Sequence, residues 1–131
     1  MSTLAATRHP ARPTKRFLVI EDDPASRDAF CALLQLTGNE AVGVENGEDA
    51  LSFLDTHPAP TAILLDVRLP VMDGWQFRRE QRSDPRLRDV PVLVVSGDVH
   101  ARDQALASGA AGFIAKPIDP DELMGAIASL P

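Results

Sequence analysis

The feature that most constrains this chain is a regular alternation between short apolar runs and segments with helical periodicity. Such alternation is typical of parallel βαβ units, in which helices cover both faces of one sheet. We therefore predict an α/β fold with five strands and five helices. The expected strands are 16–20, 40–44, 61–65, 90–95 and 111–115, and the expected helices are 23–38, 46–58, 73–85, 99–110 and 119–131.

Helix-boundary signals support two of these predictions. Asp23 and Asp119 each precede a proline, which is the order expected for an N-cap followed by the first helical residue. Gly38 follows the first of these segments and is a typical helix stop. Pro70 and Gly74 are expected to shape the loop that leads to the third helix, where Gly74 could equally be an ordinary helix-start glycine.

Length and composition limit the chain to one domain. The 131 residues, of which 44% are hydrophobic, suffice for a single core. One cysteine, Cys31, excludes an intramolecular disulfide, and no Cys and His residues have zinc-ligand spacing. No apolar run approaches the roughly 18 residues of a membrane span. We therefore expect a cytoplasmic protein that does not associate with membranes.

Charge separates the first residues from the rest. Residues 1–15 form a predicted flexible basic tail, with a transit peptide or an anionic-surface tether as the alternative, and 16–131 form the predicted domain. From residue 17 onward the chain carries 9 basic against 19 acidic residues. An acidic body argues against direct nucleic-acid binding, because contacts to phosphate supply most of that affinity. The arginine-rich stretch 78–88 is expected to be a solvated face, with a docking role as the alternative.

Polar side chains stand where the predicted strands end. Glu21 and Asp22 follow the first strand, Asp66 the third, Ser96 the fourth and Lys116 the fifth. The carboxyl ends of parallel strands meet at one edge of the sheet, where open α/β folds bind their ligands. The sequence therefore predicts that these side chains form one site.

The chemistry of this set favours phosphoryl transfer. Clustered carboxylates repel one another unless a cation joins them, and hard oxygen ligands suit Mg²⁺. With that cation and Lys116 neutralising negative charge, the Asp66 carboxylate could act as a nucleophile toward a phosphoryl group. Ser96 could then donate a hydrogen bond to a phosphoryl oxygen.

Four motifs carry a strong resemblance to the receiver domain of two-component response regulators, including the chemotaxis regulators. They are FLVIEDDP, ILLDVRLPVMDGW, VLVVSGD and GFIAKPI, in that family's order and spacing, and the resemblance covers about 16–130. It implies a flavodoxin-like sheet of order 2-1-3-4-5. It also implies a phosphorelay signalling role rather than an enzyme acting on an external substrate.

The resemblance assigns a role to each matching residue. Asp66 would be the phosphoacceptor, Ser96 the switch hydroxyl and Phe113 the switch aromatic, while Lys116 would contact the phosphoryl group. The implied metal ligands for Mg²⁺ are Glu21, Asp22, Asp66 and the backbone carbonyl of Arg68. The phosphodonor would be a histidine kinase or a histidine phosphotransfer protein. The output would be a protein target that docks on the predicted helix 99–110, strand 111–115 and helix 119–131, with the receiver a monomer or weak dimer.

Two departures from the family pattern concern the switch. Gly97 stands where Ala is usual and Phe113 where Tyr is more frequent, so the loop after Ser96 is looser and the aromatic lacks a hydroxyl. A third difference, Glu21 in place of the also common Asp, should leave metal binding intact. These differences affect the expected coupling of the switch and not the expected phosphorylation.

Other functions remain as alternatives. A flavin-binding module would need a phosphate-binding loop after the first strand, where EDDPAS is acidic. A haloacid-type phosphatase would need an Asp-x-Asp pair after the first strand and a cap insertion. A degenerate receiver that serves only as an interaction module is the remaining rival. The chain could be a stand-alone receiver, which its starting Met1 and tail favour, or a fragment of a hybrid kinase or a larger regulator.

Overall fold

The computed structural model describes residues 14–68 and 71–130 of the chain. Most of the predicted tail 1–15, together with Pro70, therefore lies outside the described residues. Strands and helices alternate as predicted, and their ends fall within three residues of the expected positions. The elements are β1 (Arg16–Ile20), α1 (Pro24–Leu36), β2 (Glu40–Val44), α2 (Gly47–Thr56), β3 (Ala62–Asp66), α3 (Gly74–Ser83), β4 (Val92–Ser96), α4 (Ala101–Ala107), β5 (Gly112–Ala115) and α5 (Pro120–Ala128).

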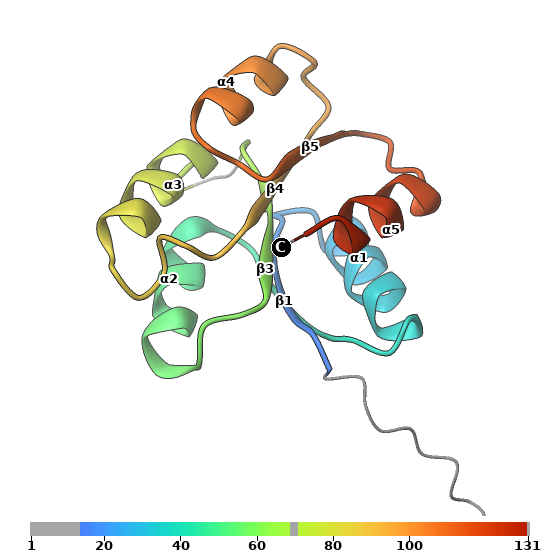
Figure 1. The fold of residues 1–131 in the computed structure, drawn as a ribbon, viewed down its shortest axis with the longest axis horizontal. Helices are drawn as coiled ribbons and strands as arrows, with labels where there is room; N and C mark the ends of the chain where they lie inside the picture. The colour runs from blue at the N-terminus through green and yellow to red at the C-terminus, as the bar shows by residue number, and fades with distance from the viewer. Residues whose placement is uncertain (1–13, 69–70, 131) are drawn as a thin grey trace, which may run out of the picture.

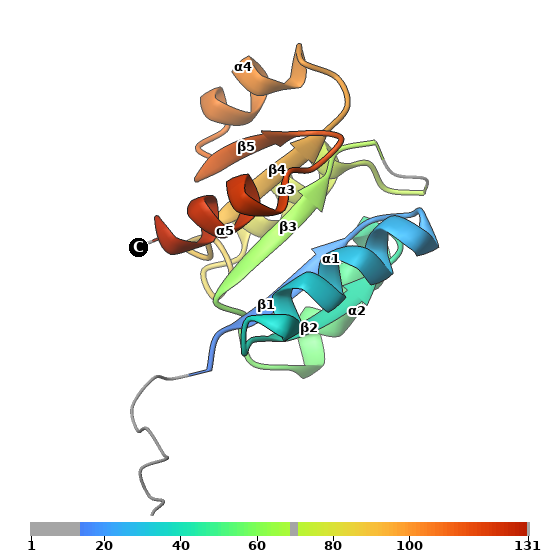
Figure 2. The same ribbon diagram turned by 90° about the vertical axis from the view of Figure 1, so that its right-hand side faces the viewer.

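The five strands form one parallel sheet in the order β2-β1-β3-β4-β5. Helices α1 and α5 cover one face, and α2 and α3 lie on the other (Figure 1). Helix α4 packs beside β4 and β5 at the far edge, as the perpendicular view also shows (Figure 2). This confirms the predicted flavodoxin-like α/β fold with strand order 2-1-3-4-5.

Strand alternation divides the core into two layers. Successive side chains of a strand point to opposite faces. In β1, Phe17 and Val19 accordingly pack in the layer that contains Phe30 of α1, whereas Leu18 and Ile20 pack in the other. The central strands β3 and β4 are buried along their whole length. Both faces of the sheet are therefore occupied, and only the strand ends remain for polar chemistry.

The predicted helix caps are confirmed. The Asp23 carboxylate accepts a hydrogen bond from the backbone N–H of Ser26 at 2.8 Å, and the Asp119 carboxylate accepts one from the N–H of Asp121 at 2.9 Å. Helix α4, at 7 residues, is shorter than the predicted 99–110. Its end is set by Gly109, whose φ of +82° lies in the left-handed region. None of the described helices is long and apolar enough to cross a membrane.

The arginine-rich stretch is not uniformly solvated, contrary to the prediction. Arg78 is only 5% exposed, and its guanidinium donates hydrogen bonds to Gln81 Oε1 and to the backbone oxygen of Ser108. Gln81 is fully buried, and its amide donates to the carbonyls of Leu87 and Val90. These side chains face inward, where they satisfy backbone carbonyls of the segments that follow α3 and α4.

Gly74 is required by a close approach of the backbone. A Cβ atom at this position would lie 2.5 Å from Val67 Cα and 3.0 Å from the backbone oxygen of Asp66. The Gly74 N–H also donates to the Val67 carbonyl at 3.1 Å. Gly74 therefore lets α3 begin directly against the end of β3, and it is not merely a helix-start glycine.

We expect Gly74→Ala to lower the free energy of unfolding by about 1–3 kcal/mol, the usual cost of overpacking a well-packed region. Urea unfolding followed by circular dichroism measures this. The matched control is Gly125→Ala in α5, where a Cβ would meet nothing within 4 Å. That variant should be unchanged or more stable by up to about 1 kcal/mol, because Ala is the better helix former. Equal stabilities for Gly74→Ala and the parent chain would refute the close approach.

Candidate functional site

Four strand ends assemble the site at the carboxyl edge of the sheet. Glu21 and Asp22 follow β1, Asp66 ends β3, Ser96 ends β4 and Lys116 follows β5. Backbone pairing keeps the last two together, because the Lys116 N–H donates to the Ser96 carbonyl at 2.9 Å. The structure thus brings to one edge all five of these predicted side chains, which come from distant parts of the chain.

The Lys116 ammonium lies between two carboxylates. Its Nζ donates to Glu21 Oε1 at 2.7 Å and to Asp66 Oδ2 at 2.9 Å. Burial by itself would lower the pKa of Lys116, but the hydrogen bonds to Glu21 and Asp66 outweigh it, so the pKa lies above its ordinary value. The peptide bond from Lys116 to Pro117 is cis. Lys116 is therefore a charged donor held at the centre of the site.

Glu21 is the most enclosed acid of the site, at 1% exposed. Its Oε2 also accepts a hydrogen bond from the backbone N–H of Asp23 at 3.2 Å. Burial raises the pKa of Glu21 above its usual value, although the hydrogen bond from Lys116 acts in the opposite direction. A further cation next to Glu21 would thus stabilise its charged form.

A third carboxylate completes an acidic cluster. Glu21, Asp22 and Asp66 each offer a carboxylate oxygen, and these oxygens all lie within 4.8 Å of one another. Asp22 is exposed, whereas Glu21 and Asp66 are buried. Lys116 is the cation that pairs with this cluster in the described part of the chain. Three acids around one ammonium leave negative charge uncompensated, and an all-oxygen donor set of this kind fits Mg²⁺.

Asp66 retains capacity for a ligand. Its Oδ1 accepts the backbone N–H of Arg68 at 2.9 Å, and its Oδ2 accepts Lys116. An ionised carboxylate has about four lone-pair positions, so each oxygen can accept one more contact. Asp66 is 6% exposed, which keeps bulk water from most of its surface.

The side chains of Ser96 and Phe113 lie on the face of the sheet opposite to that of Asp66. By strand alternation Ser96 shares its face with Val92 and Val94, which pack in the same layer as Phe113. The Ser96 hydroxyl accepts the N–H of Asp98 at 3.0 Å. Phe113 is buried, and the Arg102 guanidinium lies 5.2 Å from its ring centroid. Ser96 therefore lies at the sheet edge that holds the acidic cluster, on the face against which α4 packs.

An ion pair flanks the site. Arg68 Nη2 lies 3.4 Å from Asp98 Oδ2, with the two side chains 73% and 33% exposed. The pKa of Asp98 lies below its usual value, mainly because its carboxylate accepts the backbone N–H of His100 and further because of Arg68. Asp98 is therefore ionised at neutral pH and available to pair with Arg68.

Comparison with known proteins identifies this arrangement. Residues 17–128 match the model of the response regulator receiver domain. The chain belongs to this family. It is a receiver domain of two-component signalling systems.

Curated relatives of the receiver include a response regulator and a transcriptional regulatory protein. It is 33% identical over 116 residues to response regulator Rre1 of Synechocystis and 35% identical over 115 residues to the phosphate regulon regulator PhoB of Escherichia coli. Each match covers 86% of this chain and 50% of the relative. The receiver thus spans about half the length of these relatives.

Solved structures agree with the fold. A putative response regulator from Chloroflexus aurantiacus superposes with a TM-score of 0.84 at 28% identity, covering 90% of this chain and 98% of that one. The receiver domain of a sensor histidine kinase from Pseudomonas aeruginosa, which contains a magnesium ion in its active-site cleft, superposes with a TM-score of 0.81 at 28% identity, with the same coverage. Both neighbours are receivers or response regulators.

One residue that supports the receiver site was not predicted from the sequence. Arg27 of α1 donates through Nη1 to the backbone oxygen of Glu21 at 2.9 Å and to that of Asp22 at 3.4 Å. It holds the acidic turn after β1 against the first helix. Arg27 stands in an amphipathic helix without any motif, so the sequence contained no signal for this role.

Proposed function

We propose that the receiver accepts a phosphoryl group on Asp66 from a phosphohistidine of a histidine kinase or histidine phosphotransfer protein, and then switches or relays the signal. The observation that carries this proposal is the Lys116 ammonium, held at 2.7 and 2.9 Å between the Glu21 and Asp66 carboxylates. A fixed cation at this point is suited to stabilising charge that develops on a transferred phosphoryl group.

Glu21, Asp22, Asp66 and the backbone carbonyl of Arg68 would hold Mg²⁺ in this receiver. Support comes from the three carboxylate oxygens within 4.8 Å of one another and from the magnesium in the active-site cleft of the Pseudomonas aeruginosa receiver domain. The ion would supply neutralising charge to the phosphoryl oxygens.

In the transfer itself the chain contributes a nucleophile and oriented donors. An Asp66 carboxylate oxygen forms a bond to phosphorus while the N–P bond of the donor breaks, and that bonding pair stays with the imidazole nitrogen. Lys116 remains protonated and donates to the negative charge that gathers on the phosphoryl oxygens. The Ser96 hydroxyl donates to one of those oxygens after transfer. The receiver is thus the phosphoacceptor of a signalling step and not an enzyme for an external substrate.

The signal would leave through the face formed by α4, β5 and α5. When Ser96 turns toward the phosphoryl group, it alters the packing beside Phe113, and the partner preference of this face changes. Phe113 is already buried. It needs no partner for a hydroxyl group, so its inward state is stable without phosphate and the switch is weaker than one based on Tyr.

In this proposal the receiver domain spans 16–131 and works in the cytoplasm as a monomer or weak dimer. Its direct partners are proteins, since the acidic body disfavours nucleic acid.

Phosphorylation with acetyl phosphate tests this function. We expect intact-protein mass spectrometry to show the addition of one phosphoryl group when Mg²⁺ is present and none in excess chelator. A chain that takes up no phosphoryl group under either condition would instead be a degenerate receiver acting only through protein contacts.

The ion pair between Arg68 and Asp98 leads to a prediction about lifetime. If the two side chains close over the phosphoryl group, they obstruct an in-line water, so Arg68→Ala and Asp98→Ala should both lose phosphate several-fold faster. The loss is measured by mass spectrometry after removal of acetyl phosphate. Arg68→Ala is the cleaner variant, because Asp98 also accepts the His100 N–H.

Arg79→Ala serves as the control, since Arg79 is exposed on α3 and forms no ion pair in the described part of the chain. Its phosphate should be lost at the parental rate. Unchanged or slower loss in Arg68→Ala would refute the gate while leaving the phosphoacceptor assignment intact.

A further inference from the structure

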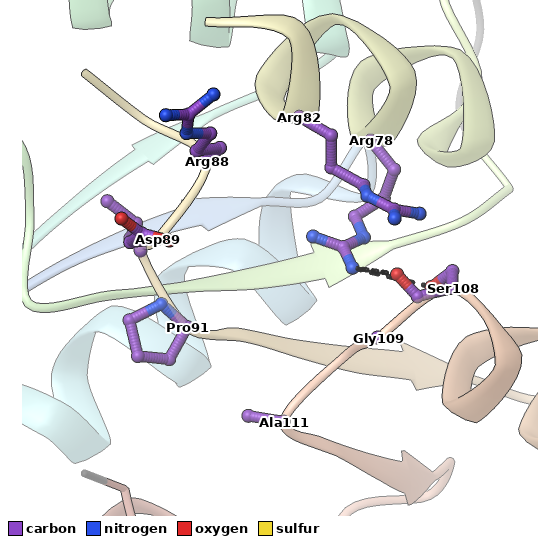
Figure 3. A pocket seen from close by; sticks show the side chains of 9 residues that line it. Arg78, Arg82, Arg88, Asp89, Pro91, Ser108, Gly109 and Ala111 are labelled. Atoms are coloured by element: carbon purple, nitrogen blue, oxygen red, sulfur yellow. Dashed lines mark hydrogen bonds between the residues drawn. The ribbon is translucent and has the colours of Figure 1, made fainter. Parts of the chain in front are cut away.

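A second polar site lies at the opposite end of the sheet from Asp66. A cavity of about 380 Å³ opens where β4 and β5 begin (Figure 3). Its walls come from α3, from the segment before β4 and from the segment between α4 and β5. Its lining residues are Arg78, Arg82, Arg88, Asp89, Val90, Pro91, Ser108, Gly109 and Ala111.

The floor of this cavity contains a buried guanidinium that has no counterion among the described residues. Arg78 is 5% exposed, and its three side-chain hydrogen bonds reach neutral oxygens of Gln81 and Ser108. Its Nε has no hydrogen-bond partner among the described residues. Within the same part of the chain no carboxylate lies within 4 Å of the Arg78 guanidinium. A buried cation in this condition is costly unless an anion reaches it.

Two more arginines surround the same space. Arg82 comes from the next turn of α3 and Arg88 from the segment before β4, and both are exposed. The charge of Arg82 adds to the effect of burial in lowering the pKa of Arg78. Asp89 is the one acid in the lining, and it forms no ion pair within 4 Å with any of the three arginines as far as the structure describes the chain. The cavity therefore has a surplus of positive charge.

The donor pattern favours a phosphate group over a carboxylate. A guanidinium presents five N–H donors in a rigid fork and binds phosphate oxygens in pairs. Three such groups offer more donors and more charge than the two oxygens of a singly charged carboxylate can use. A phosphate group has more oxygens and up to two negative charges, so it can use more of these guanidinium donors.

We propose that the cavity lined by Arg78, Arg82 and Arg88 binds a phosphate or phosphate-monoester anion. This site is separate from the phosphoacceptor site, because its residues precede β4 and β5 whereas Asp66, Ser96 and Lys116 lie at or beyond the carboxyl ends of strands. It requires neither Mg²⁺ nor phosphorylation of Asp66.

Arg78 also has a structural role, so this residue is left unchanged in the test. It fastens α3 to the carboxyl end of α4 through the Ser108 carbonyl, so its removal could unfold this region. The informative variants are Arg82→Gln and Arg88→Gln, which remove exposed donors. Arg79→Gln is the matched control, since it removes the same charge from the same helix at a position outside the lining.

Two-dimensional amide NMR of the full chain tests the proposal, with sodium phosphate added in the presence of chelator at constant pH and ionic strength. We expect saturable shifts of the amides of Ser108, Gly109 and Ala111. Arg82→Gln and Arg88→Gln should each weaken binding about tenfold, as for the loss of one hydrogen bond to a charged group. Arg79→Gln should bind as the parent does.

Two further titrations define the ligand. Adenosine monophosphate distinguishes an ester from free phosphate, because an ester ligand should bind more tightly than inorganic phosphate and shift additional amides. Sodium acetate should produce no saturable shift. The proposal is overturned by shifts confined to the region of Ser96 and Lys116, by equal weakening in Arg79→Gln, by equal binding of acetate, or by the absence of saturation.

Discussion

Asp66→Asn is expected to abolish phosphoryl uptake completely. A neutral carboxamide lacks the charge that makes the carboxylate oxygen a nucleophile, and it is a poorer partner for both Lys116 and a metal ion. Asn has nearly the same size as Asp, so the hydrogen bond from the Arg68 N–H to the side-chain oxygen can persist. The fold should therefore remain while the chemistry is lost.

Intact-protein mass spectrometry after incubation with acetyl phosphate and Mg²⁺ measures this loss, and circular dichroism confirms the fold. Asp55→Asn is the matched control, because Asp55 is exposed on α2 and is not one of the three clustered carboxylates. It should be phosphorylated like the parent. If Asp66→Asn still gains a phosphoryl group, another residue is the acceptor.

Lys116→Ala should reduce the rate of phosphorylation by about 10²–10³-fold, the usual effect of removing one preorganised donor from developing charge. The effect has two sources. The variant loses the ammonium that would contact the phosphoryl oxygens, and it leaves the Glu21 and Asp66 carboxylates facing each other without the cation that now joins them. Repulsion between these two carboxylates should also make the thermal stability of the variant depend more strongly on Mg²⁺ concentration than that of the parent, because the metal becomes the main neutralising charge.

The chain contains one other lysine, Lys15, which is exposed just before β1. Lys15→Ala is therefore the natural control and should react at the parental rate. Time courses with acetyl phosphate compare the three proteins, and thermal unfolding with and without Mg²⁺ tests the second effect. A Lys116→Ala variant that is phosphorylated as fast as the parent would remove this residue from the mechanism.

The strand-end residues could be predicted because parallel topology leaves little freedom. Once 16–20, 61–65 and 111–115 are assigned to one parallel sheet, the residues that follow them must meet at one edge. The caps at Asp23 and Asp119 were predictable for a similar reason, since each depends on a hydrogen bond to a backbone group only two or three residues away. The helix caps and the parallel arrangement of the strands can therefore both be inferred from the sequence.

Long-range side-chain contacts were not predictable in this way. Arg78 looked like a member of a solvated basic stretch, but the carbonyl it satisfies belongs to Ser108, which is 30 residues away. Arg27 supports the acidic turn through backbone oxygens, which leave no mark in a sequence motif. In both cases the partner is a main-chain carbonyl that any residue type could provide.

The sequence by itself determined the α/β class, the order of the elements and the convergence of Glu21, Asp66 and Lys116. Hydrophobic periodicity is a local property, and the alternation of strands with helices along the chain indicates a parallel sheet. Only the tertiary structure decided that Gly74 must lack a Cβ, that Arg78 is buried, and that a cavity with three arginines lies at the other end of the sheet. These features depend on distances between segments far apart in the chain. Such distances are set by how the helices pack on the sheet, which the periodicity of a single segment does not specify.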